Sequence, residues 1–139
     1  MITAATFVVD EKAKRPTLAT EKSVGFDLYA LDESEIQIRE TRIIDTGVRI
    51  NMPYGHYAMV CSRSGLAAKN QIFVLNAPGI IDGDYKDTVK VILCNMGNRP
   101  FVCKAGDRIA QLVFAPIVPV ANELLPAVER VGGLGSTGK

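Results

Sequence analysis

The chain has 139 residues, 47% hydrophobic and 22% charged, which is enough for one domain with one hydrophobic core. Its formal net charge of +1 excludes tight binding to nucleic acid or membranes through bulk charge. No apolar run is long enough to span a bilayer, and the first ten residues lack the basic flank of a signal peptide. We therefore expect an intracellular protein, cytoplasmic or nuclear, with no membrane partner and no direct nucleic-acid partner.

Short apolar runs, separated by Gly, Pro, Asp or Asn, recur along the chain. Many short strands at close spacing are typical of an all-β sandwich or barrel. The expected strands cover residues 6–9, 26–29, 36–38, 41–44, 48–51, 56–61, 72–75, 89–94, 108–114 and 117–120. One short helix is expected at residues 64–69, with Asn70 as its stop.

The three cysteines, Cys61, Cys94 and Cys103, lie inside or beside these apolar runs. No C-x-x-C pair occurs, so the sequence predicts neither a disulfide framework nor a zinc site. Buried free thiols in a reducing compartment are the expected arrangement.

Asp27 is the acid of an otherwise apolar predicted strand. A carboxylate that faces a core is costly unless it is paired or solvated. Two interpretations are open. Asp27 is either a solvent-facing residue of an edge strand or a carboxylate that holds Mg²⁺ through water, because this ion keeps several waters.

The segment CSRSGLA at residues 61–67 leads into the predicted helix. Free N–H groups at a helix start, next to Arg63, Ser64 and Gly65, attract phosphate. The alternative is a serine N-cap with a surface arginine.

The segment NAPGIIDGDY at residues 76–85 is the one around which we expect the site to be organised. The apolar runs on either side, 72–75 and 89–93, predict a β-hairpin arm with a long bend. Asp82 and Asp84 would share one face of an extended chain, and Gly83 lets the backbone approach a ligand closely. A carboxylate beside free backbone groups can activate a water while the main chain binds a flat ring.

Three other polar features have weaker signals. Gln111, within the strand expected at 108–114, is either a satisfied structural amide or a ligand contact. The glycine-rich tail, residues 132–139, is either a disordered end or a loop that wraps phosphates with its amides. His56, the single histidine, belongs to no recognisable catalytic motif and is assigned no chemistry.

In order and content, five segments resemble the motifs of the trimeric, all-β deoxyuridine triphosphate nucleotidohydrolases (dUTPases). They are GFDLYA at 25–30, RSGLA at 63–67, NAPGIIDGDY at 76–85, GDRIAQL at 106–112 and GGLGSTG at 132–138. The resemblance covers residues 20–139, and the third motif is highly specific.

The resemblance implies a distorted jelly-roll-like β-barrel over residues 1–128, assembled into a threefold homotrimer. It implies a flexible arm at residues 129–139 that closes over an active site at a subunit interface. The implied reaction is Mg²⁺-dependent hydrolysis of dUTP to dUMP and pyrophosphate. This reaction would limit uracil incorporation into DNA and supply dUMP for dTMP synthesis.

The resemblance also implies roles for single residues. Asp82 would be the general base for the water that attacks the α-phosphorus, and Asp27 would hold waters of the Mg²⁺ ion. The phosphates would be contacted by Arg63, Ser64, Gly65 and Gln111. The uracil edge would be bound by Asn76 and by the backbone from Gly79 through Ile81 to Asp84.

The same resemblance gives Tyr85 and the tail their roles. Tyr85 would pack against the deoxyribose, where a 2′-hydroxyl would sit. In the arm, Ser136 and Thr137 would close over the terminal phosphates, beside Leu134 and Gly135.

The chain departs from the family pattern at three places. Leu134 stands where an aromatic residue usually stacks on uracil, which predicts weaker substrate closure than in relatives and is tested by the KM of Leu134→Phe. Glu129 occupies the place of the usual arginine, so a phosphate role for Arg130 is not expected. Asp87 replaces a common glycine, and Asp tolerates left-handed turns.

Three alternatives to an active dUTPase are open. A dCTP deaminase-like relative typically has a glutamate as base, and Asp82 argues against it. A catalytically weakened trimeric nucleotide-binding or regulatory protein is favoured only by Leu134 and the displaced arginine. A jelly-roll structural protein without a ligand is disfavoured by five motifs in order.

Overall fold

The computed structural model describes residues 3–121. Within this range the chain forms twelve strands and one helix, α1 (Ser64–Asn70). The strands are β1 (Thr6–Val9), β2 (Thr17–Leu18), β3 (Phe26–Tyr29), β4 (Ser34–Ile36), β5 (Thr41–Asp45), β6 (Val48–Asn51), β7 (His56–Cys61), β8 (Ile72–Val74), β9 (Gly79–Ile81), β10 (Lys90–Asn95), β11 (Phe101–Cys103) and β12 (Arg108–Pro116). The predicted all-β class with one short helix is confirmed. The fold contains no helix, among residues 3–121, that is long and apolar enough to cross a membrane.

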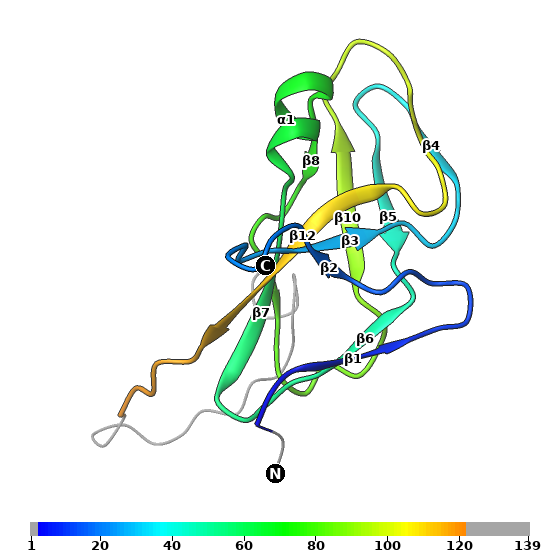
Figure 1. Cartoon of the computed structure of the whole chain (residues 1–139). Helices are drawn as coiled ribbons and strands as arrows, with labels where there is room; N and C mark the ends of the chain where they lie inside the picture. Colours follow the sequence, from blue (N-terminus) through cyan, green and yellow to red (C-terminus); the bar gives the residue numbers. More distant parts are fainter. Residues whose placement is uncertain (1–2, 122–139) are drawn as a thin grey trace, which may run out of the picture.

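The described strands form four antiparallel sheets (Figure 1). The largest has the order β2-β3-β12-β7-β9, and a second has the order β5-β10-β8. Two strand pairs, β1-β6 and β4-β11, complete the set. These sheets do not by themselves define a closed barrel, so the jelly-roll-like barrel stays a prediction.

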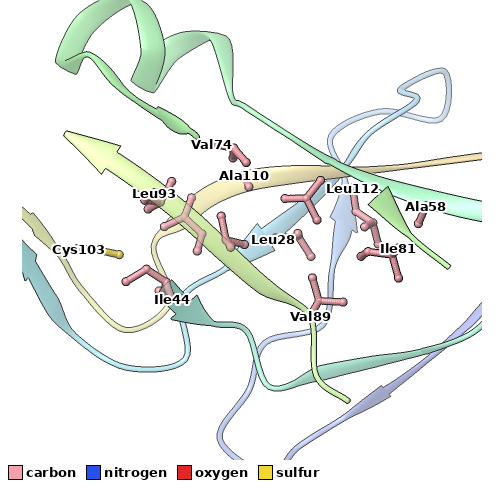
Figure 2. Packing of buried hydrophobic residues seen from close by; sticks show 14 of the residues in the cluster. Leu28, Ile44, Ala58, Val74, Ile81, Val89, Leu93, Cys103, Ala110 and Leu112 are labelled. Carbon is pink, nitrogen blue, oxygen red and sulfur yellow. The ribbon is translucent and has the colours of Figure 1, made fainter. Parts of the chain in front are cut away.

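One hydrophobic core lies between the two larger sheets (Figure 2). Leu28 and Leu112 from the five-stranded sheet and Val91 and Leu93 from β10 have no exposed surface. Alternation along the strands places these side chains inward and their neighbours outward. Burial of side chains of this size contributes about 1.5–3 kcal/mol each, so this core is the main source of stability.

The predicted hairpin arm is present, but its bend has more structure than expected. Strands β8 and β10 pair with Val74 opposite Leu93. Between them, β9 leaves this pair and joins β7 in the other sheet, with Gly79 opposite Val60. The bend therefore connects the two larger sheets, which fixes both of its ends.

The strand predicted at residues 117–120 is wrong. After β12 the chain runs away from the body of the molecule (Figure 1). Pro116 and Pro119 have no N–H to donate to a ladder, and Val118 and Val120 are 79% and 86% exposed. The N–H of Ile117 still donates to the Gly55 carbonyl at 2.7 Å, so the segment leaves the sheet only after this bond.

Other boundaries shift for local reasons. The strand predicted at 36–38 is β4, which ends at Ile36 because the N–H of Glu40 bonds the Gln37 carbonyl in a turn. Helix α1 includes Asn70 as its last residue, and the C-cap residue Gln71 adopts a left-handed conformation with φ of 53°. Strands β2, β9 and β11, of two or three residues each, were not predicted.

The three cysteines are free thiols of unequal accessibility. Cys94 and Cys103 are buried and Cys61 is half-buried. Burial, helped by the charge of Asp107, raises the pKa of the Cys103 thiol to about 11. We predict that thiol reagents at pH 8 label Cys61 first in the folded protein and reach Cys103 only after unfolding, because the thiolate is the reactive form. Mass spectrometry of peptides after timed labelling checks this order, and equal labelling of Cys103 and Cys61 would contradict it.

Candidate active site

Two groups of predicted site residues lie at different places on the described structure. The first is a row across the five-stranded sheet. Gln111 of β12 is paired with Asp27 of β3 on one side and with Cys61 of β7 on the other. Paired residues of antiparallel strands point to the same face, so Asp27 and Gln111 are adjacent although 84 positions separate them (111 − 27). We call Asp27, Arg63, Arg108 and Gln111 the sheet cluster.

Asp27 is held by two arginines. Its carboxylate lies 3.5 Å from Nε of Arg63 and 3.7 Å from Nη1 of Arg108, and its side chain is 17% exposed. The edge-strand interpretation of Asp27 is wrong, because β3 lies between β2 and β12. The polar environment comes instead from the outward face of the sheet, where the arginines offset the cost of a mostly buried carboxylate.

The Gln111 side chain has a structural bond. Its Nε2 donates to the Ser62 carbonyl at 2.9 Å, and Oγ of Ser62 accepts the N–H of Val74 at 2.9 Å. A Cβ at Gly25 would lie 2.1 Å from Oε1 of Gln111, so only glycine leaves room for this amide. Gln111 thus connects the first and second motifs and fixes the turn that carries Arg63.

Arg63, rather than a serine, occupies the N-cap of α1. Its backbone is extended, with φ of −89° and ψ of 127°, and no side chain caps the helix start. The serine N-cap interpretation is therefore wrong, because Ser64 is the first residue inside the helix. Ser64 and Gly65 are exposed, and their backbone N–H groups have no intrahelical partner, so they can donate hydrogen bonds to an anion beside the Arg63 guanidinium.

The second group lines a cavity of about 510 Å³ beside the bend at residues 76–90. This volume is in the usual range for a small-molecule site. A Cβ at Gly79 would lie 3.1 Å from Nδ2 of Asn76, so the asparagine amide packs over the glycine backbone. We call this the bend cavity. Its lining comprises Val60, Asn76, Gly79, Ile80, Ile81, Asp82, Asp84, Tyr85, Lys86, Asp87, Val89 and Lys90.

Asp82 and Asp84 both line the bend cavity, but not on one face of an extended chain. The N–H of Tyr85 bonds the Asp82 carbonyl at 3.2 Å, which closes a turn through Gly83. The predicted extended geometry is wrong for this reason. Both carboxylates are exposed, so each is free to accept a proton from a water.

Tyr85 is held at its hydroxyl, which donates to the Thr88 carbonyl at 2.8 Å. Thr88 in turn contacts Asp87 and Lys90, and Lys90 faces Asp45 across the β10–β5 pair. No motif assigns a role to Asp45, Thr88 or Lys90, and Asp87 stands out only because it replaces a common glycine of the family pattern. The only sequence signal for these contacts is Asp87 itself, because an aspartate in place of glycine adds a charged side chain that needs partners.

The described residues fit a Mg²⁺ ion that arrives with a ligand, and they do not fit one held by the protein alone. Residues 3–121 contain no group of three or more His, Cys, Asp or Glu side chains that could hold a metal. Asp27 offers one carboxylate that already faces two guanidinium groups. This donor set suits an ion that arrives on a polyphosphate and keeps its waters, and it does not suit a resident ion in a protein cage.

The structure does not bring all predicted residues together within one chain. Asp27, Arg63 and Gln111 are absent from the lining of the bend cavity. The fifth motif, with Leu134, Gly135, Ser136 and Thr137, lies outside the described residues, as do Glu129 and Arg130.

Comparisons with known proteins agree with the five motifs. A family model described as dUTPase matches residues 11–138. The chain is 43% identical over 129 residues to the deoxyuridine 5′-triphosphate nucleotidohydrolase of Anaplasma marginale (strain St. Maries), covering 88% of each chain. It is 44% identical over 138 residues to the protein of that name from Dictyoglomus turgidum, covering 94% of each.

Solved structures show the same fold. A dUTPase of Staphylococcus bacteriophage 80alpha matches with a TM-score of 0.81 at 19% identity, over 93% of this chain and 100% of that one. A dUTPase of the S. aureus phage phi11, a mutant solved with a structural Mg(II) ion, matches with a TM-score of 0.78 at 20% identity, over 91% and 99%. Together with the family model and the curated relatives, these findings show that the chain is an enzyme of the dUTPase family, as its motifs predicted.

Proposed function

We propose that the protein hydrolyses dUTP to dUMP and pyrophosphate, with Asp82 as the base that activates the attacking water. The observation that carries the proposal is an exposed Asp82 carboxylate on the wall of a nucleoside-sized cavity, in a chain of this family. A reaction in H₂¹⁸O tests it, because attack at the α-phosphorus places the label in dUMP. Label found in pyrophosphate would contradict attack at that phosphorus, and no turnover at all would refute the function.

The bend cavity is proposed as the pyrimidine site. Uracil presents an acceptor, a donor and an acceptor along its edge, which backbone groups from Gly79 to Asp84 and the Asn76 amide can match. Cytosine inverts part of this pattern and would leave buried groups unpaired, at about 1–3 kcal/mol each. A thymine methyl would have to fit against the main chain near Gly79, where the Asn76 amide already packs closely.

Substitution of Gly79 by alanine tests this assignment. The new Cβ would lie 3.1 Å from Nδ2 of Asn76 and 3.5 Å from Cβ of Val60, so the amide has to move by a few tenths of an ångström. We expect the KM for dUTP to rise by roughly threefold to tenfold with a smaller change in kcat, because ground-state binding is weakened. Steady-state kinetics measure both constants. An unchanged KM would exclude Asn76 and Gly79 from the base site.

The sheet cluster is proposed as the triphosphate site. Arg63 and the N–H groups at Ser64 and Gly65 supply positive charge, and Gln111 fixes the turn that carries them. A Mg²⁺ ion bound to the phosphates would neutralise their charge during the reaction, and Asp27 would hold its waters. Charge neutralisation and positioning are the main demands of phosphoryl transfer, so this chain needs no covalent nucleophile.

We also propose that the protein is a homotrimer of jelly-roll-like subunits with sites shared between chains. Support comes from the separation of the sheet cluster from the bend cavity, and from the exposed apolar side chains of Ile117, Val118 and Val120 beyond β12. The fifth motif, residues 132–138, would be donated by a further chain. The three free thiols fit the reducing interior of a cell, in the cytoplasm or nucleus.

Subunit mixing tests the shared site. Asp82→Asn removes the base from the bend cavity, and Arg63→Ala removes charge from the sheet cluster. If one site takes these residues from two chains, a co-assembled equal mixture of both variants recovers about a quarter of the parent activity. If both residues act within one chain, no site in the mixture is intact and activity stays at the level of the separate variants.

A further inference from the structure

The position of the Tyr85 ring depends on residues 87–90. Tyr85 is 37% exposed and lines the bend cavity. Its backbone N–H is fixed by Asp82, and its hydroxyl donates to the carbonyl of Thr88 at 2.8 Å. The tilt of the ring into the cavity is therefore set by the position of the Thr88 backbone.

Thr88 is held by two charged neighbours. Oδ1 of Asp87 accepts its N–H at 2.7 Å, and Nζ of Lys90 donates to its Oγ1 at 2.9 Å. Lys90 also donates to Oδ2 of Asp87 at 3.3 Å and lies 4.0 Å from Oδ2 of Asp45. We call Asp45, Asp87, Thr88 and Lys90 the Lys90 bridge.

The Lys90 bridge is anchored to the core at one end. Lys90 opens β10 and is paired with Asp45 of β5, whose Oδ1 accepts the N–H of Gly47 at 3.0 Å. Val89, beside it, is buried: its N–H donates to the Val48 carbonyl at 2.7 Å, and its carbonyl accepts from Oγ1 of Thr46 at 2.7 Å. The bridge thus connects the β5–β10 pair to the exposed loop that contains Tyr85.

The charges of the bridge stabilise each other. The Thr88 N–H and the Lys90 ammonium lower the pKa of Asp87. Partial burial opposes ionisation of Asp45, but the Gly47 N–H, Thr88 and Lys90 outweigh it and lower its pKa. Burial opposes charging of Lys90, and the two aspartates outweigh it and raise its pKa. All three groups are charged near neutral pH, which favours the contacts of the bridge.

We propose that Asp87 and Lys90 are positioning residues for Tyr85, and that they set how strictly the enzyme prefers deoxyribose over ribose. This inference rests on the proposed function, in which Tyr85 packs against the deoxyribose. A ring fixed at its hydroxyl leaves no space for a 2′-hydroxyl, whereas a ring released from Thr88 can tilt and admit one. Asp87, which departs from the family's usual glycine, is therefore a specificity determinant of this chain.

Variants of the bridge test the inference through a ratio of two substrates. In Asp87→Ala and Lys90→Met we expect the ratio of kcat/KM for dUTP to kcat/KM for UTP to fall by roughly threefold to tenfold, the effect of one partly exposed charged contact. A direct contact between Lys90 and the phosphates would instead lower both kcat/KM values together and leave the ratio unchanged.

The chain offers a matched control pair. Oε1 of Glu40 accepts the N–H of Gln37 at 2.8 Å and lies 3.4 Å from Nε of Arg42, which closely resembles the contacts of Asp87. Neither residue is part of the bend-cavity lining. Glu40→Ala and Arg42→Met remove the same kinds of contact, and both should keep the parent ratio. If the dUTP-to-UTP ratio of kcat/KM falls as much in the control variants as in the bridge variants, the inference is overturned.

A Tyr85→Phe background tests whether the bridge acts through the ring. Without the hydroxyl, the ring has no bond to the Thr88 carbonyl. Adding Asp87→Ala should therefore cause no further change in the ratio of kcat/KM for dUTP to kcat/KM for UTP. Two independent, additive losses would overturn the inference. These outcomes are distinct from failure of the proposed function, which would appear as absent dUTP turnover in the parent protein.

Discussion

Replacing Asp82 with asparagine is expected to reduce the kcat for dUTP by about 10²- to 10⁴-fold while KM stays close to that of the parent enzyme. Asparagine has the same shape but cannot accept the proton of the attacking water at neutral pH. Asp82 is exposed in a turn closed by backbone atoms, so the fold should be retained. Pyrophosphate release measures kcat, and a thermal melt checks that the variant is folded.

Asp84→Asn is the matched comparison for this variant. Asp84 belongs to the same turn, lines the same cavity and is also exposed, so each substitution removes one charge from the same part of the site. We expect a much smaller loss of kcat, because only Asp82 is assigned to the water. A larger loss in Asp84→Asn than in Asp82→Asn would move the general base to Asp84.

Replacing Gly25 with alanine is expected to destabilise the protein by about 1–3 kcal/mol and to lower kcat/KM for dUTP. The new Cβ would lie 2.1 Å from Oε1, 3.0 Å from Cδ and 3.2 Å from Cβ of Gln111, so the amide must leave its position. The bond from Gln111 to the Ser62 carbonyl is then lost, and with it the turn that carries Arg63. Urea unfolding at one fixed protein concentration measures the stability.

A double variant separates this cause from a general effect on β3. Gln111→Ala alone loses the Ser62 bond, and in the Gly25→Ala, Gln111→Ala variant the clashing amide is gone. The double variant should therefore be more stable than the sum of the single losses predicts. Gly65→Ala is the steric control, because a Cβ there meets nothing within 4 Å and should leave stability equal or higher. Strict additivity at Gly25 and Gln111 would contradict the clash.

The sequence predicted the fold class well because the core strands are read directly from apolar runs. Residues 48–51 and 56–61 have the observed bounds of β6 and β7. The missed strands β2, β9 and β11 have two or three residues each and owe their pairing to distant partners, such as β11 to β4. Their pattern is too short to show a period. The false strand at 117–120 is apolar, but it contains Pro119 and directly follows Pro116, and neither proline has an N–H to donate to a neighbouring strand.

The site was predicted in its parts and not in its arrangement. The motifs identified Asp27 and Gln111 separately, but their contact depends on strand register across the sheet, which no local pattern contains. The edge-strand interpretation of Asp27 failed for the same reason, since β2 is too short to be recognised. The spacing of Asp82 and Asp84 also fits an extended chain, and the local pattern does not show that the strands on either side, β9 and β10, belong to different sheets with a turn through Gly83 between them.

The contacts of the Lys90 bridge also could not be predicted from the sequence. Asp87 stood out as a departure from the family pattern and was interpreted as a tolerated turn residue. Its partners, Thr88 and Lys90, are close in sequence, but the role of the contact depends on Tyr85 bonding back to Thr88. A substitution that looks neutral in a motif can therefore be a specificity contact once the side chains are placed.

The proposed recognition of uracil is tested most directly by a hydrolysis assay with Mg²⁺ that compares dUTP with dTTP, dCTP and UTP at equal concentration. If a bent main chain binds the pyrimidine edge beside Asp82, as proposed, the kcat/KM for dUTP should exceed that for each of the other nucleotides by at least about tenfold, the factor for a single lost group. Ammonia release from dCTP, followed in parallel, should be absent. Turnover of dTTP equal to that of dUTP would contradict the account.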